Sequence, residues 1–84
     1  MTHSDHAAVR AAERYGVHAT PEQWTRAVLD IIDAVAGDAV NAVLLRRRRT
    51  DREEWLVRLA GEPLIAIYRP ETATIITVLP YGAR

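Results

Sequence analysis

Residues 54–79 read EWLVRLAGEPLIAIYRPETATIITVL, and this stretch decides the fold. Large apolar side chains recur at every second position, so that Trp55, Val57 and Leu59 share one face, as in a half-buried strand. Gly61 and Pro70 lie in the short polar breaks between apolar segments. The alternation predicts three strands, at residues 54–60, 64–69 and 73–79. Connections this short join antiparallel neighbours, so the stretch predicts a meander.

A further strand is predicted on the N-terminal side, over Ala39–Arg48, which ends in a run of arginines and a polar turn at 50–53. Two helices precede it. Ser4 and Asp5 favour a helix start, and Gly16 a left-handed stop after Tyr15. The expected core positions of this helix are Ala8, Ala11, Ala12 and Tyr15.

The tetrapeptide at 20–23, TPEQ, predicts the second helix, with Thr20 as cap, Pro21 in the first turn and Gln23 completing a capping box. This helix should end near Ala36, before Gly37. Its expected core stripe is Trp24, Val28, Ile31, Ile32 and Val35. We therefore predict a single α+β domain over 1–84, with two N-terminal helices packed on one face of a four-stranded antiparallel meander sheet.

Composition excludes several chemistries. The 84 residues include no cysteine, and all eleven basic residues are arginine. Disulfides, thiolate metal sites, Schiff-base lysines and P-loop lysines are therefore excluded. No apolar run is long enough to cross a membrane, and no apolar signal core begins the chain. We expect a cytoplasmic protein with no membrane association and no cofactor.

Charge is unevenly distributed although the formal net charge is zero. Residues 20–38 contain one arginine against four acids, whereas residues 46–58 contain six arginines against three acids. The molecule should have an acidic and a basic side, which are either solvated faces or surfaces for partners. The acidic face of the second helix that could meet a partner comprises Glu22, Asp30, Asp33 and Asp38.

The first helix carries His6, Arg10 and Arg14 at four-residue spacing, with His3 beside them. An imidazole can move a proton near neutral pH, and guanidiniums can hold phosphate oxygens, which suits cleavage of a phosphodiester. The alternative is a solvated face on which Glu13 pairs with one of the arginines. His3 and His6 have a spacing that permits two metal ligands, but the sequence offers no obvious third, so we expect no metal.

A second candidate is the arginine run, Arg46–Arg49 with Arg52 and Arg58, in which Arg46, Arg48 and Arg58 are predicted to form a nucleic-acid surface. Alternate side chains of a strand point to opposite faces, so two or three arginines at most can share one groove. The alternative is an edge strand that charge protects from aggregation. No aromatic residue lies between the arginines, which argues against a base-stacking platform.

Three segments carry a family resemblance: residues 6–17 (HAAVRAAERYGV), 55–61 (WLVRLAG) and 67–80 (IYRPETATIITVLP). Together they resemble small, often phage- or prophage-encoded toxin-like domains with an HxxxRxxxR helix. These domains are grouped with the barnase, colicin-D and RelE-like ribonuclease superfamily. The likeness covers nearly the whole chain, from His6 to Pro80, through short and degenerate motifs.

The resemblance implies metal-independent RNA cleavage through a 2′,3′-cyclic phosphate. His6 would then transfer protons, Arg10 and Arg14 would hold phosphate, and Thr77 would face the site, with Tyr81 a further candidate. RelE-type enzymes use lysine, which this chain lacks. The sheet could then offer only Arg58 or Arg69, and the resemblance also admits a catalytically degenerate relative.

Two other functions stay open. One is a phage-encoded inhibitor of a host immune complex, of the anti-CRISPR type, whose acidic helix face imitates nucleic-acid phosphates. The other is a structural or regulatory homodimer paired through strand edges. The expected partners are therefore RNA or a protein–nucleic-acid complex, a cognate protein, or a second copy of the chain.

Overall fold

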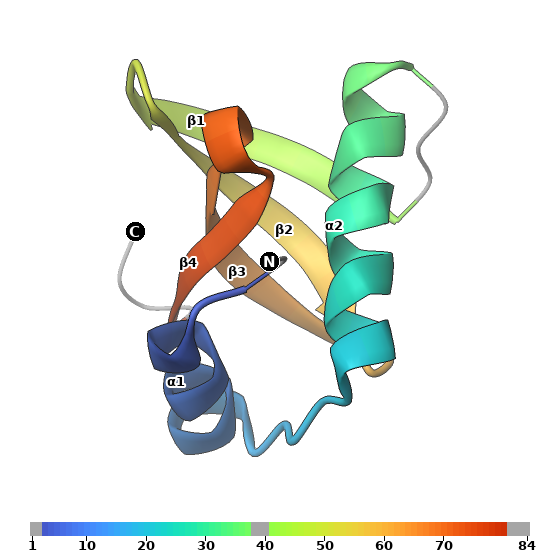
Figure 1. Cartoon of the computed structure of the whole chain (residues 1–84), viewed down its shortest axis with the longest axis vertical. Helices are drawn as coiled ribbons and strands as arrows, with labels where there is room; N and C mark the ends of the chain where they lie inside the picture. The colour runs from blue at the N-terminus through green and yellow to red at the C-terminus, as the bar shows by residue number, and fades with distance from the viewer. Residues whose placement is uncertain (1–2, 38–40, 81–84) are drawn as a thin grey trace.

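The computed structural model describes residues 3–37 and 41–80, and it confirms the predicted α+β class (Figure 1). Two helices are followed by four strands. The elements are α1 (Asp5–Tyr15), α2 (Pro21–Val35), β1 (Ala42–Arg49), β2 (Arg52–Leu59), β3 (Glu62–Arg69), the short 3₁₀ helix η1 (Pro70–Thr72) and β4 (Thr74–Leu79). Asp38, Tyr81 and the predicted start of the first strand at Ala39 lie outside the described residues.

Both helices begin where the local sequence predicts. The Ser4 hydroxyl accepts a hydrogen bond from the Ala7 amide, and α1 is followed by Gly16 at φ 68°. Thr20 and Gln23 form a reciprocal capping box at the start of α2. These caps satisfy backbone groups that the first and last turns of a helix leave unpaired.

The four strands form one antiparallel sheet in the order β1-β2-β3-β4. One row of side chains crosses all four strands in register, namely Leu44, Trp55, Ala66 and Val78. Strand β1 has register shifts between Leu44 and Arg46 and again between Arg47 and Arg49. These bulges change which arginines of the run point to which face of the sheet.

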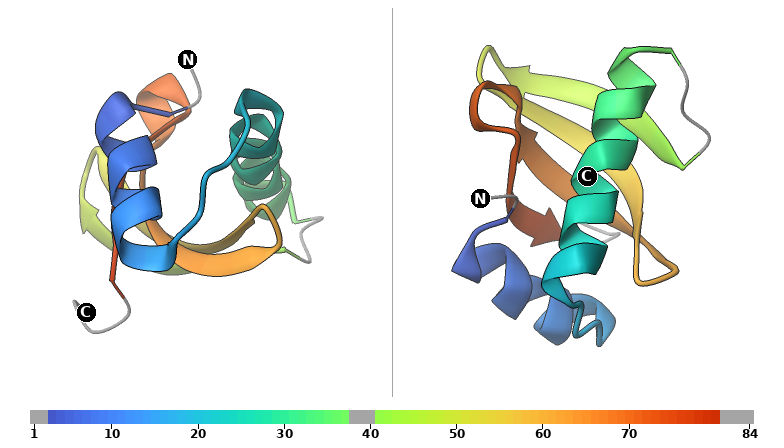
Figure 2. Two further views of the ribbon diagram at one scale, coloured as in Figure 1. Left: turned by 90° about the horizontal axis from the view of Figure 1, so that it is seen from below. Right: turned by 45° about the vertical axis from the view of Figure 1, so that its right-hand side comes forward.

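The two helices cover the same face of the sheet, with α1 against β4 and α2 against β1 and β2 (Figure 2). The core lies between them and the sheet, around Trp24 and Ile31 of α2 and Trp55 of β2. The opposite face of the sheet, which we call the open face, has no helix over it (Figures 1 and 2). No helix in the described part of the chain is long and apolar enough to cross a membrane.

Two predicted core positions of α2 are wrong, because Ile32 and Val35 are 42% and 72% exposed. Ala27 takes a core position instead. Val35 follows Ile31 by one turn, on the same side of the helix, and lines an open groove between α2 and β1. On α1, the predicted core residue Ala11 is fully buried, and so is Ala7, which was not predicted. The other three predicted positions, Ala8, Ala12 and Tyr15, are half-buried.

His3 does not belong to the predicted stripe on the first helix. It precedes α1, forms a parallel bridge with Ile75 and stacks on Trp24, with ring centroids 4.5 Å apart. The next residue, Ser4, donates its amide to Ile75 and its hydroxyl to Ile76. This short segment therefore attaches the start of the chain to β4.

Candidate nucleic-acid interface

The helix residues predicted to be catalytic have separate surroundings. His6 is exposed on α1. Arg10 forms an ion pair with Glu13, with 2.7 Å between Nη1 and Oε1, which is the pairing expected of a solvated helix face. Arg14 donates from Nη1 to the carbonyl oxygen of Val78 at 2.7 Å. One guanidinium is thus engaged within the helix, and the other holds α1 against β4.

Tyr15 makes a second connection between α1 and the sheet. Its hydroxyl donates to the carbonyl oxygen of Leu79 and accepts the amide of Ile65 at 3.4 Å. Because Arg14 and Tyr15 both bond to backbone groups of the sheet, the last turn of α1 has a structural role in positioning the helix.

Thr77 lies on the open face, away from the side that α1 covers. It stands opposite Ile67, which in turn stands opposite Glu54. Its neighbour Val78 points into the core on the helix side. The structure therefore brings Thr77 together with residues of the sheet rather than with His6.

Glu54 lies on the open-face side of β2, opposite Arg46 of β1 and Ile67 of β3. Its side chain is fully buried, although glutamate is almost never fully buried unless it is paired. Arg46 Nε lies 3.4 Å and Arg48 Nη1 lies 3.9 Å from Glu54 Oε1. The bulge after Leu44 sets Arg46 opposite Glu54, whereas Arg47 points to the other side and pairs with Glu53 at 3.4 Å. Two of the predicted nucleic-acid residues thus share one face.

A pocket of about 190 Å³ opens beside Arg48, which pairs with Glu54. It is lined by Arg48, Arg49, Arg52, Ile67, Ile76 and Thr77. The pocket unites Thr77, predicted from the family resemblance, with Arg48, predicted from the arginine run. Arg49 and Arg52 belong to the arginine run but not to the three residues predicted to form the surface. The bulges in β1 set these two residues opposite each other, and the sequence does not reveal where a bulge falls.

Positive charge exceeds negative charge around this pocket, which we call the arginine pocket. The described residues that line it include three arginines and no carboxylate. At its rim, Asp51 lies 4.0 Å from Arg52 and 3.6 Å from Arg69. Among the described residues, no carboxylate lies within ion-pairing distance of Arg49. The concave shape and the uncompensated guanidinium favour an anion as ligand.

Arg58 does not join this cluster. It stands six residues after Arg52 on β2, which corresponds to roughly 20 Å along a strand. Its Nη1 donates to the carbonyl oxygen of Gly61 at 3.4 Å. The third predicted nucleic-acid residue therefore lies at the far end of the sheet.

The acidic face of α2 carries its own counter-charge. Arg26 Nε lies 3.2 Å from Asp30, and Arg26 Nη2 lies 3.6 Å from Asp33. Glu22 lies in the first turn of the helix, where a carboxylate interacts favourably with the helix dipole. The described part of this face is therefore less negative than its carboxylates alone suggest.

Two groups elsewhere have shifted pKa values. Burial against Trp24 lowers the pKa of His3, and nearby Asp5 opposes that shift. Burial raises the pKa of Tyr68, and the charge of Glu53 adds to this. The described residues contain no group of three or more His, Asp or Glu side chains able to hold a metal ion.

Comparison with known proteins finds no matching family model, no matching curated protein and no matching solved structure.

Proposed function

We propose that this protein is an RNA-directed, ribonuclease-toxin-like protein that holds a phosphodiester in the arginine pocket. The observation that supports this most directly is the meeting of three arginines with the Thr77 hydroxyl in one concavity. Guanidiniums can hold phosphate oxygens with two parallel hydrogen bonds, and a hydroxyl can donate a further one. The two helices lie on one face of the meander, and no helix covers the face that carries Arg48 and Thr77 (Figure 2).

The pocket is better suited to binding than to cleavage. Transfer of the 2′-hydroxyl proton needs a base near the phosphate. Glu54 is buried between Arg46 and Arg48, and His6 is on α1, beside the covered face. These positions favour the catalytically degenerate form of the proposal, in which RNA is bound and turned over slowly or not at all.

The first test is RNA affinity. Fluorescence anisotropy with a labelled twelve-nucleotide single strand at 50 mM salt compares wild type with the double variant Arg48→Gln/Arg49→Gln. Loss of two phosphate contacts should weaken binding by about 60-fold at this salt concentration. The control Arg10→Gln/Arg26→Gln removes the same charge from the helices and should bind as wild type does. Equal losses in both double variants would contradict the assignment.

Cleavage is tested separately. Wild type is incubated with the same RNA, and the fragments are examined for 2′,3′-cyclic phosphate ends, beside a growth assay in a heterologous host. RNA bound without cyclic-phosphate fragments and without growth arrest is the expected result.

The inhibitor hypothesis has less support, because Arg26 offsets the negative charge of Asp30 and Asp33 on α2. Reversing Asp30 and Asp33 should leave RNA affinity unchanged under our proposal.

A further inference from the structure

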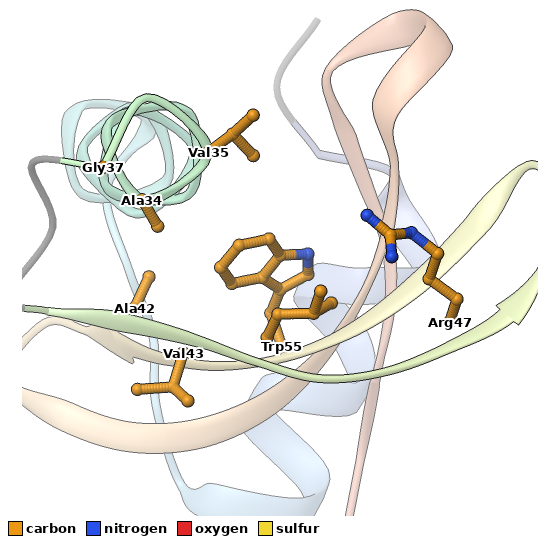
Figure 3. Close-up of a pocket in the computed structure, with 8 residues that line it drawn as sticks. Ala34, Val35, Gly37, Ala42, Val43, Arg47 and Trp55 are labelled. Carbon is orange, nitrogen blue, oxygen red and sulfur yellow. The ribbon is translucent and has the colours of Figure 1, made fainter.

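An apolar groove of about 430 Å³ runs between the last turn of α2 and β1, on the side of the sheet opposite the arginine pocket. Figure 3 shows Ala34 of α2, Ala42 of β1 and Trp55 of β2 turned toward the space between helix and strand. Val35 stands at its rim and is 72% exposed. A valine in line with the core residues of its helix but left in water indicates a surface that a further chain can cover.

One end of the groove is polar because Arg47 lines it. The Arg47 side chain is 71% exposed, and Arg47 Nε lies 3.4 Å from Glu53 Oε2. The indole Nε1 of Trp55 donates to Glu53 Oε1 at 3.0 Å. Figure 3 shows the Trp55 nitrogen turned toward the Arg47 guanidinium. Because the Arg47 side chain is largely exposed and a guanidinium carries five N–H donors, Arg47 can meet an additional carboxylate beside Glu53.

Strand β1 is also an edge of the sheet. It pairs with β2 on one side, and no strand among residues 3–37 and 41–80 pairs with its other side. Alternate N–H and C=O groups along that side point outward, ready for another strand. The sequence of this edge is apolar over 42–45 and basic over 46–49.

We infer that β1 and its groove bind an extended acidic and apolar segment of a partner protein, which adds to the sheet as a fifth strand. Main-chain hydrogen bonds to β1 would supply affinity. An apolar side chain of the segment would enter the groove beside Trp55 and Val35, and a carboxylate would reach Arg47. In antiparallel addition the acidic half of the segment comes first, because β1 runs from apolar to basic.

Charge argues against a second copy as the occupant. An antiparallel pair of β1 strands centred on Leu45 would set Arg46 opposite Leu44 and Arg47 opposite Val43. The described residues of β1 include no carboxylate that could face these guanidiniums. An acidic and apolar segment can set apolar side chains beside residues 42–45 and carboxylates beside residues 46–49. A second copy of β1 would instead set arginines beside apolar residues.

The test uses a synthetic peptide and the whole chain. The peptide has ten residues with capped ends, alternating glutamate and threonine in its first half and valine and threonine in its second. A matched peptide carries lysine in place of each glutamate. Calorimetry measures both affinities, and the indole N–H resonance of Trp55 reports where the peptide binds. We expect the acidic peptide alone to bind and to shift this resonance.

Two matched variants decide the site. Val35→Glu adds a negative charge at the groove and should weaken acidic-peptide binding at least tenfold. Val9→Glu makes the same change at an exposed valine of α1 and should have no effect. RNA affinity should be unchanged in both, which keeps this test separate from that of the arginine pocket. Three results would each overturn the inference. The first is equal affinity of Val35→Glu and Val9→Glu for the acidic peptide. The second is no binding of the acidic peptide at about 1 mM, and the third is sedimentation that shows a dimer which Val35→Glu dissociates.

Discussion

Replacing Arg49 with glutamine should reduce the salt dependence of RNA binding by a predictable amount. Arg49 lines the arginine pocket, is exposed, and has no carboxylate within ion-pairing distance among the described residues. Its removal therefore leaves no charge unpaired within the fold. The formal net charge of the chain is zero, so there is no general attraction to RNA, and the salt dependence has to come from local contacts.

The magnitude follows from the three guanidiniums that line the pocket. Each phosphate contact to a single strand contributes about −0.7 to the slope of log K against log salt, so wild type should show about −2.1 and Arg49→Gln about −1.4. Between 50 and 200 mM salt the wild-type affinity should fall roughly 18-fold and that of Arg49→Gln roughly 7-fold. The variant should bind about eightfold more weakly than wild type at 50 mM and about threefold more weakly at 200 mM.

Anisotropy titrations at four salt concentrations provide the slopes, with Arg26→Gln as the control of equal charge change. Circular dichroism confirms that each variant is folded. The control should keep the wild-type slope, because Arg26 is engaged with Asp30 and Asp33 on α2. If Arg49→Gln and Arg26→Gln show the same slope, RNA does not use the arginine pocket and the proposed interface is wrong.

Three further outcomes are expected. Tyr15→Phe removes hydrogen bonds to two backbone groups of the sheet, so it should lower the free energy of unfolding by about 1–2 kcal/mol and Tm by roughly 5–12 °C, as thermal unfolding followed by circular dichroism will show. In the folded state the pKa of His3 lies below its ordinary value of 6.5. The stability that His3 contributes is therefore present above pH 6.5 and is lost as pH falls through the folded pKa. Urea titrations should find that the free energy of unfolding depends less on pH in His3→Gln than in wild type. Thr77→Val should weaken RNA binding severalfold in anisotropy titrations, whereas His6→Ala should not. The reason is that Thr77 lines the arginine pocket and His6 is not among its lining residues.

Local signals predicted most of the fold. Thr20 and Gln23 form a capping box because the interaction spans only three residues and needs no tertiary context. The strand alternation of Trp55, Val57 and Leu59 was equally readable, since one face of a strand must be buried when helices cover it. These features depend on neighbours in sequence, and the structure places them as predicted.

The site depended on features that no local pattern contains. The bulge after Leu44 reverses the alternation of the arginines, so the face on which each one lies follows from pairing with β2. Val35 has the spacing of a core residue, and its exposure follows from where the sheet ends beneath α2. The meeting of Thr77 with Arg48 required the curvature that brings β4 and β1 to one pocket, because the two strands are at opposite edges of the sheet.

Strand β1 thus contributes to two surfaces with different chemistry. Arg47 points to the apolar groove and Arg48 to the arginine pocket, although they are adjacent in sequence. Under our two proposals, a phosphate would be recognised by charge on the open face, whereas a protein segment would be recognised by the edge of β1 and the groove on the covered face. The two ligands would therefore occupy different sides of one strand. They would be linked only through the long-range electrostatic field of its arginines. At high salt that field is screened, so any mutual influence would be confined to low ionic strength, while each ligand keeps its own contacts.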